Sequence, residues 1–366
     1  MATTDKHLYV CIMAGGKGER FWPFSRAGRP KQLLAITGAQ PMITETAQRN
    51  VGLVAPDHLY IVTTRAQAPD IAAAVPDIPG ANILGEPCGR DTAPCIGLVC
   101  ALLAARDPHA VLAVIPADHS IPDHDLYAAT VRDAAAVARR DHALVTIGIA
   151  PRYPETGYGY ILAGERISSP GTTDFSKVER FIEKPPRAQA EELIATGRAF
   201  WNAGMFVFRV SDMLAELKRH LPELHEGLAR ITAAAGDAQC AAVIEDVYAT
   251  APKISIDYAV MEKAGNVAVA HGTFQWDDVG SWVAVSAHWP QDAHTNATRG
   301  TVVAIDSANC VVGSDSDGVI GLIGVRDLVV VRTGDAVLVC PKDRAQDVKK
   351  LVQELRANPS LAGYVD

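Results

Sequence analysis

Short apolar segments alternate with helical patterns over roughly the first 285 residues of the chain. Five continuous runs of aliphatic residues are typical of strands that are buried on both faces of a sheet. These runs are Leu8–Met13, Leu59–Thr64, Val111–Ile115, Leu144–Ile149 and Met205–Val210. Between them, Thr92–Ala105 and Leu126–Arg140 carry apolar residues at helical spacing. The alternation of strands and helices predicts an α/β fold with a mostly parallel sheet.

The pattern changes after about residue 285, where short β-type runs follow one another without a helical segment between them. Gly, Asp, Ser and Asn separate these runs, which are Val302–Ile305, Cys310–Gly313, Val319–Ile323, Leu328–Val331 and Ala336–Val339. The last segment, Ala345–Ala357, is amphipathic. Its apolar face carries Val348, Leu351, Val352 and Leu355. We therefore predict an α/β domain over residues 1–285 and a small β-rich domain with a closing helix over residues 286–366.

Composition and charge narrow the classes of function. The chain has 366 residues, of which 48% are hydrophobic, so wholesale disorder is excluded. No apolar run approaches the roughly 18 to 20 residues that span a bilayer, and we expect no membrane partner. The formal net charge is −8. A protein that binds nucleic acid normally has a basic surplus, so we expect no nucleic-acid partner, although a few cations would suffice for a small anionic ligand.

The seven cysteines indicate a reducing compartment. They are scattered, and no Cys-x-x-Cys pair occurs, so a zinc knuckle is not expected. Most lie beside Val, Ile, Leu or Ala, where free cysteine behaves as a small core residue. We therefore expect a cytoplasmic protein.

A glycine-rich turn follows the first predicted strand. Gly15, Gly16 and Gly18 allow backbone N–H groups to close on a phosphate, and the cations of Arg20 and Lys31 could reach the same anion. The carboxyl end of a strand in an α/β sheet is the usual place for a nucleotide. The pattern is neither a Walker loop nor the dinucleotide motif, which lacks its third glycine here. A tight turn without a ligand is the ordinary alternative.

The complete string from Met13 to Arg26, followed by Arg29-Pro-Lys-Gln, resembles the signature of the sugar-1-phosphate nucleotidylyltransferases, and in particular their mannose-1-phosphate guanylyltransferase branch. The resemblance implies a Rossmann-like sheet of the nucleotide-diphospho-sugar transferase type, with a C-terminal domain like a short left-handed β-helix. It also implies roles for the turn. The three glycines would hold the triphosphate of the nucleotide, and Arg20 and Lys31 would be the catalytic cations that stabilise the transferring phosphate.

A second motif, Glu86-Pro-Cys-Gly-Arg-Asp-Thr-Ala-Pro, is similar to the family segment beside the nucleotide base. The resemblance assigns nucleotide binding to Glu86, Pro87 and Arg90. Asp91 stands where the family usually has Asn, and a carboxylate cannot donate the hydrogen bond of an amide. Thr92 would suit the N-cap of the predicted helix. Without the resemblance, the segment would be interpreted as a loop with a capping residue.

Two carboxylates form a candidate metal site. Asp118 directly follows a predicted buried strand, and oxygen ligands of this kind suit Mg²⁺. A single aspartate in this position is more often a turn former, so a partner is needed. The family resemblance assigns Mg²⁺ to Asp118 together with Asp278, with the adjacent Asp277 as the alternative. We interpret His119 as structural, because no helical His-x-x-x-His spacing accompanies it.

Five residues of the predicted sugar-binding half come from four further motifs. The resemblance assigns contacts with the sugar phosphate to Gly159, Glu183, Lys184, Asn202 and Asp257. Glu183 could accept hydrogen bonds from hydroxyls, and Lys184 could neutralise a phosphate. Taken singly, each motif is typical of a surface segment or a turn. The Glu-Lys dipeptide would be interpreted as a solvated strand edge. The segment from Ser255 would be interpreted as an ordinary helix start.

The activity implied by the resemblance is Mg²⁺-dependent transfer of GMP from GTP to mannose 1-phosphate, and relatives suggest a homodimer through the β-rich tail. An isomerase domain is not expected in a chain that stops at Asp366. Two alternatives stay open. One is an enzyme for another hexose 1-phosphate or nucleoside triphosphate. The other is a non-catalytic nucleotide-sugar-binding regulatory protein, which should have lost Arg20, Lys31 or a metal carboxylate.

Overall fold

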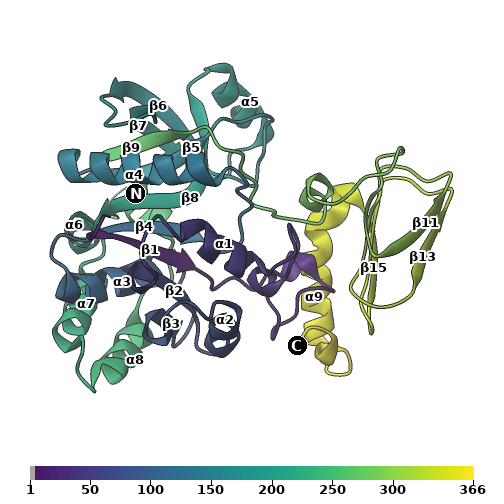
Figure 1. Cartoon of the computed structure of the whole chain (residues 1–366), viewed down its shortest axis with the longest axis horizontal. Coiled ribbons are helices and arrows are strands. Elements are labelled where there is room, and N and C mark those ends of the chain that lie inside the picture. Colours follow the sequence, from purple (N-terminus) through teal and green to yellow (C-terminus); the bar gives the residue numbers. More distant parts are fainter. Residues whose placement is uncertain (1–4) are drawn as a thin grey trace. The chain divides into compact units, whose positions relative to one another are not determined.

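The computed structural model describes residues 5–366, and the chain divides into two compact units (Figure 1). Neither unit is one continuous stretch of sequence. The first unit contains the residues up to 15, 47–116 and 121–276. The second contains residues 16–46, 117–120 and 277–366. The signature string is therefore divided between Gly15 and Gly16, and most of it lies in the second unit.

A nine-stranded sheet forms the centre of the first unit, in the order β3-β2-β1-β4-β8-β5-β9-β7-β6. The strands are β1 (Leu8–Met13), β2 (Leu59–Thr64), β3 (Ile83–Glu86), β4 (Val111–Pro116), β5 (Leu144–Ile149), β6 (Tyr160–Ile167), β7 (Phe175–Ile182), β8 (Ala199–Arg209) and β9 (Val267–Gly272). Neighbouring strands in the row β3-β2-β1-β4 pair in parallel, and β5 also pairs in parallel with β9. All other pairs are antiparallel.

The sheet is therefore mixed, and the expectation of a mostly parallel sheet was wrong beyond β4. The reason lies partly in the connections. Parallel strands need a crossover of a dozen or more residues, and the segment between β6 and β7 is too short for one. In addition, β8 lies between β4 and β5 and runs antiparallel to both.

Helices cover both faces of the sheet, which explains why its central strands read as continuous apolar runs. On one face, the packed helices are α3 (Thr92–Arg106), α6 (Val210–His220), α7 (Pro222–Ala234) and α8 (Cys240–Thr250). Leu112 and Val114 of β4 point into this core, so the alternate residues of β4 face α4 (His124–Asp141), which contacts β4 and β8. The other α-helices of this part of the chain are α1 (Met42–Asn50), α2 (Ala68–Ala74) and α5 (Arg187–Ala195).

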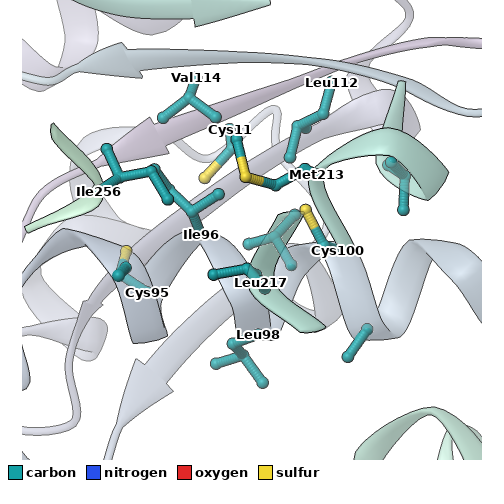
Figure 2. Close-up of a cluster of buried hydrophobic side chains, with 14 of the residues drawn as sticks. Cys11, Cys95, Ile96, Leu98, Cys100, Leu112, Val114, Met213, Leu217 and Ile256 are labelled. Atoms are coloured by element: carbon teal, nitrogen blue, oxygen red, sulfur yellow. The ribbon is translucent and has the colours of Figure 1, made fainter. Parts of the chain in front are cut away.

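The cysteines are free, and four of the seven are buried, as predicted for small core residues. Three of the buried cysteines belong to the core beneath α3. Figure 2 shows Cys11, Cys95 and Cys100 among Ile96, Leu112, Met213 and Leu217. Burial raises the pKa of all three thiols, so the neutral forms persist at physiological pH.

Stacked short strands form the C-terminal part of the second unit. They are β10 (Ala297–Arg299), β11 (Thr301–Ile305), β12 (Val311–Ser314), β13 (Val319–Ile323), β14 (Leu328–Arg332) and β15 (Val337–Pro341). The sheets are β10-β12-β14-β15 and β11-β13, and all pairs except β14–β15 are parallel. Asn309 bonds to Asp327 across an offset of 18 residues, and Val311 pairs with Val329 at the same offset. One turn of the stacked strands therefore takes 18 residues, and the sequence showed no repeat of this length.

The closing helix α9 (Val348–Ala357) packs its apolar side into the core of the second unit. Val348 and Val352 are buried, and Leu355 packs against them from the edge of the core. Leu351 is 38% exposed, so the predicted apolar face is only partly covered. Within the described residues, no helix has the length and apolar character that crossing a bilayer requires.

Candidate functional site

A cavity of about 310 Å³ lies within the second unit, and residues from five separate stretches of the chain line it. Five of the predicted site residues are among them. They are Gly18, Arg20, Lys31, Asp118 and Asp278. Gly15 and Gly16 are not lining residues, and Gly15 lies instead near Glu86 in the first unit. The volume falls within the range of small-ligand sites.

Gly18 allows the signature turn to fold closely over Lys31. Its φ angle of 64° lies in the left-handed region. A Cβ atom added to Gly18 would stand 2.7 Å from the backbone nitrogen of Lys31. Ser25 fixes the turn, because its hydroxyl donates to the Gly18 carbonyl over 2.7 Å. Gly18 is therefore required both by its backbone angle and by the contact with Lys31.

Lys31 links the carboxylate of Asp118 to the backbone of Asp278. Its side chain is almost fully buried, and its Nζ donates to Asp118 Oδ2 at 2.9 Å, to the Asp118 carbonyl at 3.0 Å and to the Asp278 carbonyl at 2.7 Å. Burial opposes ionisation of Asp118, but the adjacent ammonium outweighs it and lowers the pKa of this carboxyl. All three donors of the ammonium are thus used within the cavity wall.

The neighbours Asp277 and Asp278 have different partners. Asp277 Oδ1 accepts from the backbone of Val279 over 2.7 Å, and His288 Nε2 lies 3.1 Å from its Oδ2. Burial opposes ionisation of Asp277, yet the His288 contact keeps its pKa below the usual value. Asp278 lines the cavity, and its Oδ1 accepts from Gly280 over 2.9 Å. Of the two alternatives, Asp278 is the carboxylate in the cavity wall.

A strained backbone residue, Val279, directly follows these two aspartates. Val279 has a φ angle of 46°, which is unusual for a β-branched residue and costs on the order of 1–3 kcal/mol. Its side chain is fully buried with Trp282 in the core of the second unit, which holds the backbone in place. The strain therefore lies directly beside the cavity carboxylate. Within residues 5–366, no three His, Cys, Asp or Glu side chains form a metal cluster, so an ion here would need ligands from substrate or water.

The Glu86 segment lies in the first unit, where Glu86 ends β3. Its carboxyl group is buried and accepts a hydrogen bond of 2.9 Å from the Tyr248 hydroxyl of α8. Burial raises the pKa of Glu86 to about 7, and the Tyr248 hydrogen bond acts in the opposite direction. Sequence reasoning missed Tyr248, because a single tyrosine in a helix gives no signal of such a role.

Arg90 is held by α8 rather than being open to solvent. Its Nε donates to the Tyr248 carbonyl at 3.0 Å, and its Nη2 donates to the Ala249 carbonyl at 2.9 Å. These carbonyls belong to the last turn of α8, where a cation is favourable. Pro87 is half-buried beside this region.

The start of α3 differs from the prediction, since Asp91 and not Thr92 is the N-cap. Asp91 Oδ1 accepts from the Thr92 backbone over 2.8 Å. Its φ angle is 69°, a conformation that Asn and Asp tolerate better than most residues. Thr92 Oγ1 instead accepts from the Ile256 backbone over 2.8 Å, which links this segment to the one containing Asp257.

Four of the predicted sugar-binding residues come together in the first unit. The Asn202 backbone donates to the Gly159 carbonyl, and Asn202 Nδ2 donates to Asp257 Oδ1, both over 2.8 Å. A Cβ atom added to Gly159 would stand 2.6 Å from Glu183 Oε2, so a larger residue here would displace the end of that side chain. Burial, and then the charge of Glu183, raise the pKa of Asp257 to about 6. We refer to these four residues as the carboxylate cluster.

Lys184 stands at the exposed side of the carboxylate cluster and pairs with Glu183 Oε1. This hydrogen bond raises the pKa of Lys184 despite partial burial. Glu183 is 15% exposed and Lys184 is 62% exposed, so only the lysine fits the description of a solvated strand edge. Trp201 and Asn202 lie within β8 rather than in a turn, and the segment after Ser255 is one turn of π-helix, Asp257–Met261.

A family model described as nucleotidyl transferase matches residues 9–294, and a second model, a MannoseP isomerase/GMP-like β-helix domain, matches residues 300–355. This chain belongs to the nucleotidyl transferase family. The resemblance drawn from the signature motifs is therefore confirmed at the level of the family, and the stacked strands after residue 300 correspond to its β-helix domain.

Individual members of the nucleotidyl transferase family match nearly the whole chain. A mannose-1-phosphate guanylyltransferase from Klebsiella pneumoniae is 39% identical over 96% of this chain and 74% of its own length. The xanthan biosynthesis protein XanB of Xanthomonas campestris is 40% identical over 94% of this chain and 73% of its own. A crystal structure from Thermus thermophilus, described as a mannose-1-phosphate geranyltransferase, superposes with a TM-score of 0.85 at 40% identity, covering 96% and 99% of the two chains.

Several residues that no motif assigned also line the cavity of this nucleotidyl transferase. Lys17 lies inside the signature string, so its position in that string was the available signal. His119, which was interpreted as structural, lines the cavity beside Asp118. Lys349 of α9 also lines the cavity, and its neighbours in the sequence are those of an ordinary solvent-exposed helix, so they gave no signal of this role.

Proposed function

We propose that this chain transfers GMP from GTP to α-D-mannose 1-phosphate, giving GDP-mannose and pyrophosphate. Similarity to named mannose-1-phosphate guanylyltransferases over nearly the full chain supports this substrate pair. The observation that carries the proposal is the cavity in which Lys31 joins Asp118 and Asp278 beside Arg20. A regulatory protein without catalysis would have no need to keep all four groups in one wall.

The reaction joins two anions, and the residues of this chain address that difficulty. An oxygen of the sugar phosphate attacks the α-phosphorus of GTP, the bond to the bridging oxygen breaks, and pyrophosphate leaves with the electron pair. The attacking phosphate is already an anion, so no general base is required. In the proposal, Arg20 and Lys31 stabilise negative charge on the transferring group, and the N–H groups of the signature turn orient the triphosphate.

The carboxylate cluster holds the second substrate in this proposal. Asp257 and Glu183 accept hydrogen bonds from vicinal mannose hydroxyls, and the Asn202 amide, fixed by Asp257 and Thr146, contacts the same sugar. Lys184 neutralises the phosphate of mannose 1-phosphate. On the nucleotide side, Glu86 accepts hydrogen bonds from the base, while Pro87 and Arg90 shape that segment.

Mg²⁺ is the proposed cofactor, with Asp118 and Asp278 as its protein ligands. The donor set fits this ion, because Mg²⁺ is commonly held by one or two carboxylates together with substrate phosphates and water. The contacts of Lys31 support the assignment, because its ammonium bonds to the Asp118 carboxylate and to the Asp278 carbonyl in the same wall. When bound, the ion would neutralise charge on the phosphates as a Lewis acid. Lys31 and Arg20 supply the remaining positive charge from the protein.

We further propose the two-domain division at residue 285, a left-handed winding of the stacked strands, a cytoplasmic location and a homodimer through the β-rich tail.

An exposed apolar face supports the dimer. Four aliphatic side chains on neighbouring strands β11 and β13 are each more than half exposed. They are Val303, Ile305, Val319 and Ile323. Ile323→Glu should shift sedimentation velocity from dimer to monomer, whereas a wild-type dimer that survives this change would contradict the assignment of the face.

One assay tests the proposed activity. The protein is incubated with Mg²⁺, each of the four common nucleoside triphosphates and a panel of hexose 1-phosphates, and pyrophosphate release is measured. We expect the highest kcat/KM with GTP and mannose 1-phosphate. A preference for another pair would redirect the proposal to that sugar or base. The lack of release with every pair, in protein that binds GTP, would favour the regulatory alternative.

A further inference from the structure

The helix α9 carries a face of basic residues that packs against the signature turn. The helix contacts the 3₁₀ turn Glu19–Phe21, and Arg356 Nη1 donates to Glu19 Oε1 over 3.0 Å. Next to these basic residues on the helix surface, Val348 and Val352 are buried in the core of the second unit, which also contains Phe21. The position of α9 beside the signature turn is therefore fixed by apolar burial and by an ion pair.

Lys349 lies on the same face of α9 as Arg356. The two residues are seven positions apart, which is nearly two helical turns, or about 10 Å along the axis. Lys349 lines the same cavity as Gly18, Arg20 and Lys31. Lys349 is an i,i+3 neighbour of the buried Val352, so its long, exposed side chain starts from the edge of the anchoring core and can present its ammonium to this cavity.

The charges around the cavity leave this ammonium available for an anion. Lys31 is occupied by Asp118, and Arg356 offsets the charge of Glu19. Between residues 5 and 366, Lys349 has no ion-pair partner. Positive charge from more than one chain segment suits a polyphosphate, whose negative charges are spread along its length.

We propose that Lys349 is a binding residue for the triphosphate of GTP and for the pyrophosphate product, supplied to the cavity by the C-terminal helix. This inference rests on the proposed function and extends it, because the family motifs end before this helix and none of them assigns a role to it. The β-rich domain then contributes to nucleotide binding directly, in addition to its place in the assembly.

The next residue, Lys350, provides a matched control. It has the same side chain and lies in the same turn of α9, but it pairs with Asp347 Oδ1 over 2.7 Å. It lines a different hollow, together with Leu338 and Leu351, and does not line the cavity that contains Arg20 and Lys31. Lys349→Ala and Lys350→Ala remove the same charge and make the same change in helix propensity. A difference in KM between the two variants would therefore come from the position of Lys349 at the cavity.

The test compares the kinetics of both variants in the full chain with Mg²⁺. Lys349→Ala should raise the KM for GTP about tenfold, the expected effect of losing one charge-assisted hydrogen bond. Its kcat and its KM for mannose 1-phosphate should stay near wild type. In the reverse reaction, the KM for pyrophosphate should rise similarly. Lys349→Arg should restore most of the affinity, and Lys350→Ala should behave like wild type.

Three results separate this inference from the proposed function. Equal GTP and pyrophosphate KM values for Lys349→Ala and Lys350→Ala would overturn it while leaving the activity intact. A rise confined to mannose 1-phosphate would overturn it as well. If the wild type releases no pyrophosphate with any substrate pair, calorimetric titration with inorganic pyrophosphate replaces the kinetics. Weaker binding by Lys349→Ala than by Lys350→Ala would then support the inference, and equal binding would overturn it.

Discussion

The cavity of the second unit, where cations and carboxylates meet, and the carboxylate cluster of the first unit differ in charge and in construction. The cavity is lined by Lys17, Arg20, Lys31 and Lys349, which come from chain segments more than 300 residues apart. The carboxylate cluster is built from Glu183 directly after β7, Asn202 within β8 and Asp257 at the start of a π-helical turn. Basic groups suit phosphates, and carboxylates suit hydroxyl donors, so the two regions are built for different ligands.

Buried charge is stabilised differently in the two regions. Lys31 is buried with three oxygen acceptors, and its ammonium lowers the pKa of Asp118. Asp257 is buried beside another carboxylate, and its pKa is raised to about 6. The cavity therefore keeps its groups ionised, whereas the carboxylate cluster contains an acid that titrates near neutrality. Substitutions and pH changes should separate the contributions of the two regions.

The largest effect is expected for Asp278→Ala. Loss of a metal carboxylate should lower kcat by about 100- to 1,000-fold at saturating substrates and Mg²⁺, in the range seen when one charge-stabilising group is removed. Asp277→Asn is the matched control, because an asparagine oxygen can still accept from the Val279 backbone. The control should keep kcat within about threefold of wild type. Wild-type turnover in Asp278→Ala would refute the assignment of this carboxylate.

The next largest effect is expected for Lys184→Ala, which tests the carboxylate cluster. The KM for mannose 1-phosphate should rise about tenfold, because a charge-assisted contact with the sugar phosphate is lost. Lys177→Ala is the control, since Lys177 makes an exposed ion pair with Glu165 on the same sheet. An increase confined to the KM for GTP would contradict the division of roles between the two regions.

A smaller effect is expected from pH. Asp257 is ionised only above about pH 6, because burial and Glu183 raise its pKa, with Lys184 opposing them. The KM for mannose 1-phosphate should therefore increase as the pH falls from 8 through 6, and Asp257→Asn should reduce this dependence to the part caused by titration of the substrate phosphate, whose pKa is about 6. The folded protein binds this proton more tightly than the unfolded chain, so the group weakens folding as the pH rises from 3.8 towards 6. A KM with the same pH profile in both proteins would exclude this role of Asp257.

The smallest effect is expected for Tyr248→Phe, which removes the hydrogen bond to Glu86. The KM for GTP should rise about threefold at pH 8, in line with one neutral-donor hydrogen bond. Without that donor, the pKa of Glu86 should move above about 7, so Glu86 becomes protonated at a higher pH than in wild type. As the pH is lowered from 8, the KM for GTP should therefore start to increase earlier in Tyr248→Phe than in wild type. Tyr258→Phe is the control, because its side chain is exposed and lies beside the carboxylate cluster. An unchanged pH profile would leave Tyr248 with a packing role only.

The fold could be predicted where burial is uniform. The strands β1, β2 and β5 lie at the residues predicted for them, because strands covered on both faces appear as uninterrupted apolar runs. The strands β6 and β7 were missed, since their outer halves are exposed and polar and carry no such run. In β8, the Trp201–Phe206 motif contains Asn and Gly, which are typical of turns, and pairing on both sides overrode that local preference.

The site could be predicted where its residues belong to motifs. Arg20, Lys31, Asp118 and Asp278 were named from short strings, and the structure places all four in one cavity. Tyr248 and Lys349 could not be named, because each is an ordinary residue on an amphipathic helix. Their positions depend on tertiary packing between segments distant in sequence, which no local pattern encodes.

The last residues of the chain are bonded to the signature string near its beginning. The Trp22 indole donates to the Tyr364 carbonyl over 2.8 Å, and the Ala27 backbone donates to the Val365 carbonyl over 2.9 Å. During synthesis on the ribosome, the partners of Trp22 and Ala27 emerge more than 330 residues later. The strands β1 to β9 can pair before that moment, but the turn that carries Arg20 cannot complete its contacts until residues 364 and 365 have been synthesised. Nascent chains would thus acquire their sheet first and their ability to bind nucleotide last.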